Sequence, residues 1–98
     1  MSKYLFLWES NINLMPANPT ERAALIGKQI EMTKQALKDK KIIDWGLYAS
    51  GNAGYAIGEG TTQDALKGAM QFDPYVKFQT IPVLSIDEVA DVMKSMMG

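Results

Sequence analysis

Hydrophobic positions near the start of the chain alternate with a period of two. Over residues 3–10, β-prone aromatic side chains alternate with leucines, which predicts a strand with apolar side chains on both faces. The two sets are Tyr4, Phe6 and Trp8 on one face and Leu5 and Leu7 on the other. Both faces of the sheet must therefore be covered. Helices can cover one face, and in so short a chain a second subunit is the natural cover for the other.

The next apolar spacing is helical. Residues 10–18 are predicted to form a polar loop, and Asn18-Pro19-Thr20-Glu21 then provides a cap, a proline at the first helical position and an early acid. One amphipathic helix of roughly twenty residues should follow, with lysines near its C-terminal end. Its main stripe is predicted to be Ala23, Ile26, Ile30, Thr33 and Leu37, widened by Leu25, Met32 and Ala36.

Two strands joined by a tight turn are predicted next. Residues 42–50 form the second strand, residues 50–54 a turn that tolerates positive φ, and residues 55–59 the third strand. Thr61 and Thr62 are candidate caps of a short helix that ends before Asp73-Pro74. These segments form a hairpin followed by a helix.

Residues 75–84 supply a fourth strand. Pro82 lacks a donor for the hydrogen-bond ladder, so this strand belongs at an edge, as the strand order 4-1-3-2 requires. Ser85-Ile86-Asp87-Glu88 is a capping box and predicts a third helix, in which Met93 and Met96 are expected to make core contacts. The fold class predicted for residues 1–98 is one α+β domain, ferredoxin-like β-α-β-β-α-β with an extra C-terminal helix and a four-stranded antiparallel sheet.

The composition limits the catalytic and metal-binding chemistry that the chain can perform. The 98 residues contain no cysteine and no histidine, which removes thiolate and imidazole catalysis and nearly every transition-metal ligand set. No metal and no cofactor are expected. The net charge of −1 gives no general attraction to nucleic acid. The apolar run within the first ten residues is too short for a signal peptide or a membrane span. We expect a cytoplasmic protein without nucleic-acid or membrane partners.

Several segments resemble a known family. They are Trp45, Gly54-Tyr55-Ala56-Ile57-Gly58-Glu59, Phe72-Asp73-Pro74-Tyr75, and Phe78 leading to Pro82-Val83-Leu84. Over roughly residues 42–90 they resemble muconolactone isomerase and its small relatives in the dimeric α+β barrel superfamily. The resemblance implies a homodimer in which two sheets pack face to face, with any ligand in a cleft beside that interface. Function transfers less well than fold, and the histidines of several enzymatic branches do not exist here.

One end of the predicted sheet gathers the candidate site residues. In this topology the ends of strands one and two meet the starts of strands three and four. The side chains predicted to bind a ligand at this rim are Trp8, Tyr48, Asn52, Tyr55 and Tyr75. Aromatic residues pack in a core or a dimer interface more often than they bind a ligand, so this alternative stays open.

Glu9 is the candidate catalytic residue. A carboxylate that continues the Leu5 and Leu7 face would be partly desolvated, which would raise its pKa toward a useful value for proton transfer. The plainer reading, and the more common one for a strand-end acid, is a solvated or lysine-paired carboxylate.

Three functions stay open at this point. The first is a small homodimeric domain, or a higher oligomer, that binds a small aromatic or carboxylated molecule at the sheet rim. The second is a cofactor-independent isomerase or lyase that uses Glu9 as proton shuttle, with Tyr48 and Tyr55 as orienting groups. The third is a structural dimerisation module without a ligand.

Overall fold

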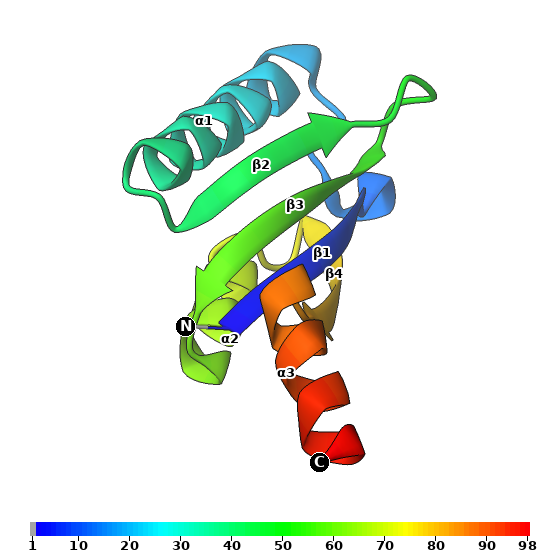
Figure 1. Ribbon diagram of the computed structural model, residues 1–98. Coiled ribbons are helices and arrows are strands. Elements are labelled where there is room, and N and C mark those ends of the chain that lie inside the picture. Colours follow the sequence, from blue (N-terminus) through cyan, green and yellow to red (C-terminus); the bar gives the residue numbers. More distant parts are fainter. Residues whose placement is uncertain (1) are drawn as a thin grey trace.

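The computed structural model describes residues 2–98, which form a four-stranded antiparallel sheet and three α-helices in the order β-α-β-β-α-β-α (Figure 1). This is the α+β, ferredoxin-like arrangement that the sequence predicts. The elements are β1 (Ser2–Ser10), a 3₁₀ turn η1 (Ile12–Leu14), α1 (Pro19–Lys38), β2 (Ile42–Leu47), β3 (Ala53–Gly60), α2 (Thr62–Met70), β4 (Val76–Val83) and α3 (Ile86–Met97).

The strands lie in the order β2-β3-β1-β4, and each is antiparallel to its neighbours. The predicted order is therefore confirmed, and β4 is an edge strand that accommodates Pro82 opposite Tyr4. Residues that stand opposite each other in such a ladder share a face of the sheet. Even-numbered residues of β1 and β4 consequently face one side, and odd-numbered residues face the other.

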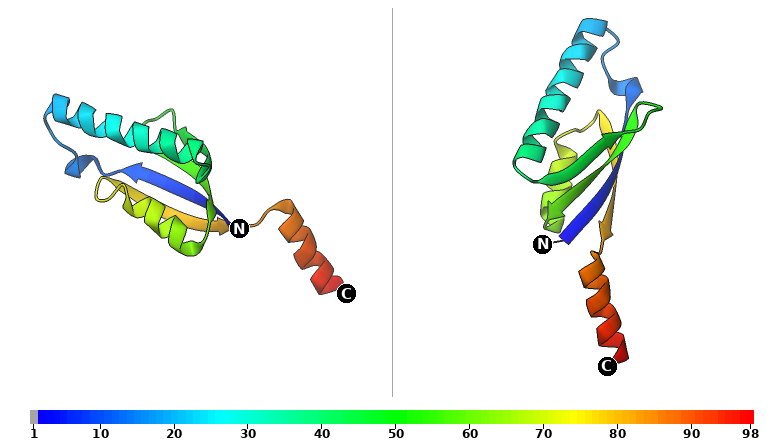
Figure 2. Two further views of the ribbon diagram at one scale, coloured as in Figure 1. Left: turned by 90° about the vertical axis from the view of Figure 1, so that its left-hand side faces the viewer. Right: turned by 45° about the horizontal axis from the view of Figure 1, so that its top comes forward.

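The core lies on the face that the helices cover. Tyr4 and Phe6 of β1 pack with Ala56 and Ala65, and Phe78 adds a partly buried ring to the cluster. Helices α1 and α2 both lie on this side of the sheet, as the right-hand view of Figure 2 shows. The opposite face, which we call the open face, is covered by no helix among residues 2–98.

Two glycines of β3 make room for aromatic rings on the core face. A Cβ atom on Gly54 would lie 2.6 Å from Cζ2 of Trp8, and one on Gly58 would lie 2.6 Å from Cε2 of Phe6. The rings therefore occupy the space that side chains would fill, which explains why this strand is rich in glycine.

Side chains at the helix starts satisfy the free backbone N–H groups there. Asn18 accepts hydrogen bonds from the backbone of Thr20 and Glu21 at the start of α1, as predicted. Thr61 with Asp64, and Ser85 with Glu88, form capping boxes at α2 and α3. The β2–β3 turn has positive φ at Gly51 and Asn52, so these helix and turn signals are confirmed.

The predicted inner face of α1 is wrong for most of its main stripe and right for Thr33 and the widening residues Leu25, Met32 and Ala36, which are half-buried. Ile26, Ile30 and Leu37 are exposed, and the half-buried side chains belong to the neighbouring column, which includes Leu25 and Met32. The helix has two adjacent apolar columns, and a single chain offers a contact surface, mainly β2, for only one of them. We call the uncovered column Ala23, Ile26, Ile30 and Leu37 the outer stripe of α1.

The third helix leaves the body of the molecule beyond the end of β4 (Figure 2). The resulting shape is elongated, with principal extents of 62 × 25 × 22 Å. The expectation that Met93 and Met96 make core contacts is wrong, because their exposed fractions are 52% and 78%. Loop 10–18 also differs from the sequence prediction, since residues 12–14 form a 3₁₀ turn.

Candidate functional site

The end of β1 lies between the loops that precede β3 and β4. The backbone N–H of Ser10 donates to the carbonyl oxygen of Asn52 at 2.7 Å, and the N–H of Asn11 donates to that of Tyr75 at 2.7 Å. The structure therefore brings together the backbone positions that the topology predicts at the rim. Tyr48 and Asn52 have exposed side chains there, and Tyr75 is half-buried.

The side chains at this rim point to two different faces. Trp8 lies on the helix side and stacks on Trp45, with ring centroids 5.4 Å apart and an interplanar angle of 13°. Its indole Nε1 donates to the carbonyl oxygen of Tyr55 at 3.3 Å. The phenol of Tyr55 lies on the open face, so these aromatic side chains do not form one pocket.

Tyr55 spans two strands on the open face. Its ring lies where a Cβ atom of Gly46 would be, and its hydroxyl donates a 2.9 Å hydrogen bond to Oδ2 of Asp44. This hydrogen bond, followed by burial and by the negative charge of Asp44, raises the pKa of Tyr55 above its ordinary value of 10.0. Tyr55 is therefore a neutral hydrogen-bond donor at physiological pH.

Glu9 lies on the open face, opposite Ala53 in β3 and Lys77 in β4. Its side chain is exposed in the single chain, so the partial burial expected for it is not found. Its catalytic role stays a prediction without support from its surroundings.

A groove of about 800 Å³ opens beside the rim, between α2 and the edge strand β4. Its polar residues, Asn11, Asp73 and Lys77, come from the loop after β1, the turn before β4 and the start of β4. The apolar lining is Leu14, Leu66, Ala69, Met70, Pro74, Val76 and Phe78. A ligand here would meet mainly aliphatic and aromatic side chains together with the amide of Asn11 and the carboxylate of Asp73.

Sequence reasoning missed the lining of this groove. It predicted a cleft at the sheet rim lined by Trp8, Tyr48, Asn52, Tyr55 and Tyr75, none of which lines the groove. The turn Phe72-Asp73-Pro74-Tyr75 carries part of the family resemblance and could have identified one wall. The opposite wall comes from η1 and α2, which have no motif that marks them as a site.

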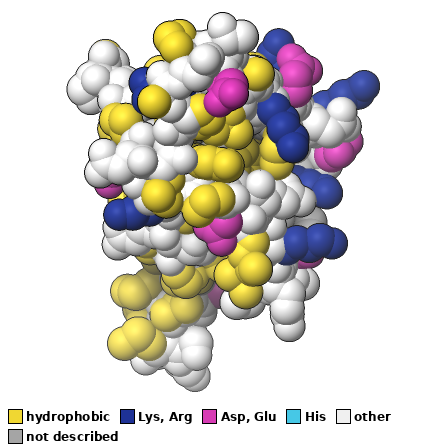
Figure 3. Space-filling view, turned by 180° about the vertical axis from the view of Figure 1, so that it is seen from behind, with side chains coloured by type: hydrophobic (Ala, Val, Ile, Leu, Met, Phe, Trp, Pro, Cys, Tyr) yellow, Lys and Arg dark blue, Asp and Glu magenta, His cyan; other side chains and the backbone are white. Residues whose placement is uncertain are grey.

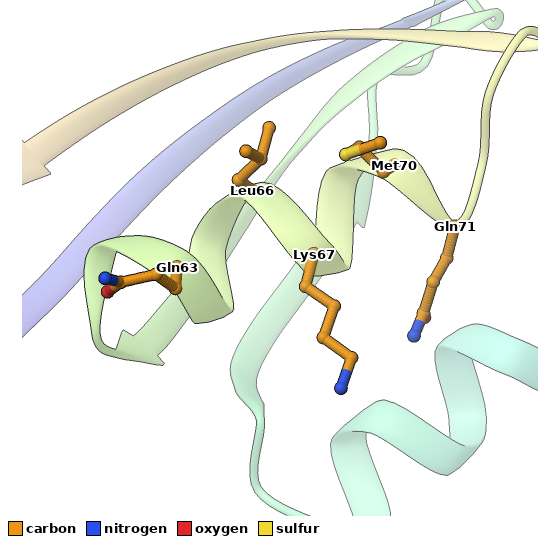
Figure 4. A pocket seen from close by; sticks show the side chains of 5 residues that line it. All are labelled: Gln63, Leu66, Lys67, Met70 and Gln71. Carbon is orange, nitrogen blue, oxygen red and sulfur yellow. The ribbon is translucent and has the colours of Figure 1, made fainter.

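A shallower hollow of about 520 Å³ lies on the outer surface of α2. Figure 4 shows Leu66 and Met70 pointing away from the helix on one side, while Lys67 and Gln71 point to the other, toward α1. Leu66 and Met70 belong to the linings of both the hollow and the groove.

The open face is an apolar sheet surface that the helices among residues 2–98 leave uncovered. Its central side chains are half-buried by their neighbours in the sheet and have no layer above them. By the strand register they are Leu5 and Leu7 of β1, Tyr55 and Ile57 of β3, and Ile81 and Val83 of β4. A surface of this kind marks an interaction site in most proteins.

Two further features bear on the class of site. Among residues 2–98, no group of three or more acidic side chains lies close enough together to hold a metal ion. No helix within the same residues is long and apolar enough to cross a membrane.

The sheet order, the two helices on one face and the rim loops define a ferredoxin-like α+β domain. Within that class, residues 3–97 match the model of a domain of unknown function, DUF3303, and the chain belongs to this family. A search of curated proteins finds no match. The resemblance to muconolactone isomerase therefore stays a prediction.

Proposed function

We propose that this protein is a homodimeric domain whose two copies pack through their open faces and bind a small aromatic or carboxylated molecule in the rim groove. The observation that carries the proposal is the contrast between the two sides of the sheet. Five hydrophobic side chains of residues 2–98 are buried on folding of one chain, whereas the open face leaves six apolar side chains without a cover.

So small a core stabilises a single copy weakly. The buried set is Tyr4, Phe6, Ala56, Ala65 and Val76, and two of these side chains are alanine. Each large apolar side chain that a partner covers contributes roughly 1.5–3 kcal/mol when fully buried. Covering the open face with a second copy would therefore supply a large share of the stability that a domain of this size needs.

The chemistry of the groove supports the choice of ligand. Its volume of about 800 Å³ lies in the range of small-molecule sites, roughly 300–1,000 Å³. Phe78 and Leu14 offer apolar contacts, and the side-chain amide of Asn11 offers a hydrogen-bond donor for a carboxylate. The groove is open on one side, so a bound molecule gains further contacts only where another chain closes it.

A fluorescent aromatic carboxylate, 2-naphthoate, is a direct probe of this site, with uncharged 2-methylnaphthalene as its matched control. We expect 2-naphthoate to bind the wild type and to bind Asn11→Ala roughly tenfold more weakly, which corresponds to about 1.4 kcal/mol. Asn13→Ala, which removes a neighbouring exposed amide that does not line the groove, should bind as the wild type does. Equal affinity of the two asparagine variants would refute the assignment of the groove.

The two remaining functions give distinct results. A dimer that binds neither naphthalene compound would be a dimerisation module without a ligand. The isomerase hypothesis requires Glu9 in a desolvated position, and its exposure in the single chain gives that hypothesis no support.

A further inference from the structure

We propose that α3 is an exchanged arm, which packs its apolar stripe along the outer stripe of α1 in a second copy of the chain. The proposal goes beyond the open-face contact because it assigns a partner to two helical surfaces that the open face does not include. The exposure of both helical surfaces, their opposite charges and the short linker before α3 support it.

The apolar stripe of α3 has no cover within its own chain. Apolar residues recur at spacings of three and four on one side of the helix, and acids and a lysine occupy the other side. The stripe consists of Ile86, Val89, Ala90, Met93, Met96 and Met97. Ile86 and Met97 are 80% and 83% exposed. A twelve-residue helix is marginal in water by itself, so α3 requires a packing partner to stay helical.

The outer stripe of α1 offers an apolar surface that is long enough for α3. Ile26, Ile30 and Leu37 are exposed along a helix of 20 residues, which is longer than α3 and can support its whole length. Gly27 lies beside this stripe, and the space above its Cα holds no other atom within 4 Å. A glycine in a helix interior lowers helix stability, and it lets a second helix approach closely.

The charges of the two helices are opposite. Helix α3 carries Asp87, Glu88 and Asp91 against Lys94, whereas α1 carries four basic side chains against two acidic ones. Seen from the helix-covered side, Lys and Arg side chains gather along the flank of the molecule that carries α1, while hydrophobic side chains cover α3 at its lower end (Figure 3). This complementarity favours α1 as the partner and disfavours an anionic membrane surface, which attracts basic helices.

The partner helix must belong to another copy. Helix α1 packs on β2, whereas α3 leaves from β4, and these strands are the two opposite edges of the sheet. Only Leu84 and Ser85 separate β4 from α3, and the helix points away from the body (Figure 2). A linker of two residues cannot return α3 across the sheet to its own α1.

Disulfide trapping tests the proposal directly, because the chain contains no cysteine of its own. Ile30→Cys and Met93→Cys are made as separate variants, one of them isotopically labelled, and mixed under mild oxidation. We expect a disulfide-linked heterodimer, identified by its intact mass. Circular dichroism of each variant checks that it folds.

The matched control replaces the polar-face residue Asp91 with cysteine. Ile30→Cys with Met93→Cys should form the heterodimer several times faster than Ile30→Cys with Asp91→Cys. Added salt should slow the first reaction by screening the helix charges. Equal rates for the two pairs would overturn the proposal, as would an intrachain disulfide in the variant that carries both Ile30→Cys and Met93→Cys.

The result is separable from the open-face proposal. If the cross-link fails while the protein is still dimeric, the exchange is wrong and the open-face dimer stands. If the cross-link forms but open-face substitutions leave the dimer intact, the exchanged arm is the dimer contact and the open-face proposal is wrong.

Discussion

The hydroxyl of Tyr55 reaches across from β3 to Asp44 on β2 and donates it a 2.9 Å hydrogen bond, while its ring covers Gly46. The pair ties the edge strand β2 to the centre of the sheet. The pair also places a titratable group, the phenol of Tyr55, on the open face, so the stability of the protein depends on pH through this contact.

The hydrogen bond predicts a loss of stability at high pH. The folded-state pKa of Tyr55 is raised, chiefly by the hydrogen bond to Asp44, so its contribution is fully present below the ordinary value of 10.0. The contribution is lost as the pH rises through the folded-state pKa. Asp44→Asn should bring the pKa of Tyr55 back toward the ordinary value, measured by NMR titration of the Tyr55 Cζ resonance. An identical titration in the variant would contradict this account, and Asp73→Asn is the control.

A methyl group at Gly54 should destabilise the protein. The Cβ atom of an alanine there would overlap the carbonyl oxygen of Gly46 and lie 2.6 Å from Trp8. We expect Gly54→Ala to lower the free energy of unfolding by about 1–3 kcal/mol, measured by urea denaturation. Gly68→Ala in α2 is the control, since its Cβ atom meets nothing within 4 Å, and it should raise stability by about 0.5–1 kcal/mol. Equal effects of the two substitutions would show that the close packing at Gly54 is unimportant.

The stacked indoles predict an effect on both stability and optical signal. Trp45 lies against Trp8 across β3, so Trp45→Leu should remove an aromatic pair worth about 0.5–1.5 kcal/mol beyond its buried area. The near-ultraviolet circular dichroism of coupled indoles should fall at the same time. Tyr48→Leu, which changes an exposed aromatic residue of the neighbouring hairpin, should leave that signal unchanged. If Trp45→Leu retains the signal, the two indoles are not stacked in solution.

The capping boxes predict sensitivity to acid. Hydrogen bonds from the backbone and side chain of Thr61 lower the pKa of Asp64, and Ser85 lowers that of Glu88 in the same way. A lowered carboxyl pKa gives stability that is present above the unfolded-state value and lost as the pH falls through the folded-state value. Thr61→Ala should therefore lower the thermal midpoint at neutral pH and flatten its fall in acid. Ser95→Ala, on the exposed side of α3, should do neither, and a Thr61→Ala profile parallel to that of the wild type would refute the linkage.

Local signals predicted the elements well because each helix start has its own chemistry. Asn18-Pro19 and the box from Ser85 to Glu88 determine where α1 and α3 begin, and these positions agree with the structure. Pro82 indicated the edge strand, because a residue without a backbone N–H cannot donate a hydrogen bond to the ladder of a central strand. These are properties of a few neighbouring residues, which a sequence displays directly.

Long-range packing was harder to predict. Helix α1 has two apolar columns, and only the position of β2 decides which of them is covered. The stack of Trp8 on Trp45 depends on a register shift between Ile42 and Asp44. No local sequence motif predicts this shift. The groove was not predicted for the same reason, since its walls come from segments that are distant in the sequence.

The central claim is that the open face is a contact between two copies, and the solution mass of the wild type and of Leu7→Lys tests it most directly. Light scattering at micromolar concentration should give the wild type twice the chain mass of 10.8 kDa. Leu7→Lys puts a charge in the middle of the open face and should give a monomer that is folded but less stable than the wild type. The exposed β4 substitution Thr80→Lys, on the other side of the sheet, should remain a dimer. A wild type that is monomeric, or a Leu7→Lys variant as fully dimeric as Thr80→Lys, would contradict the account.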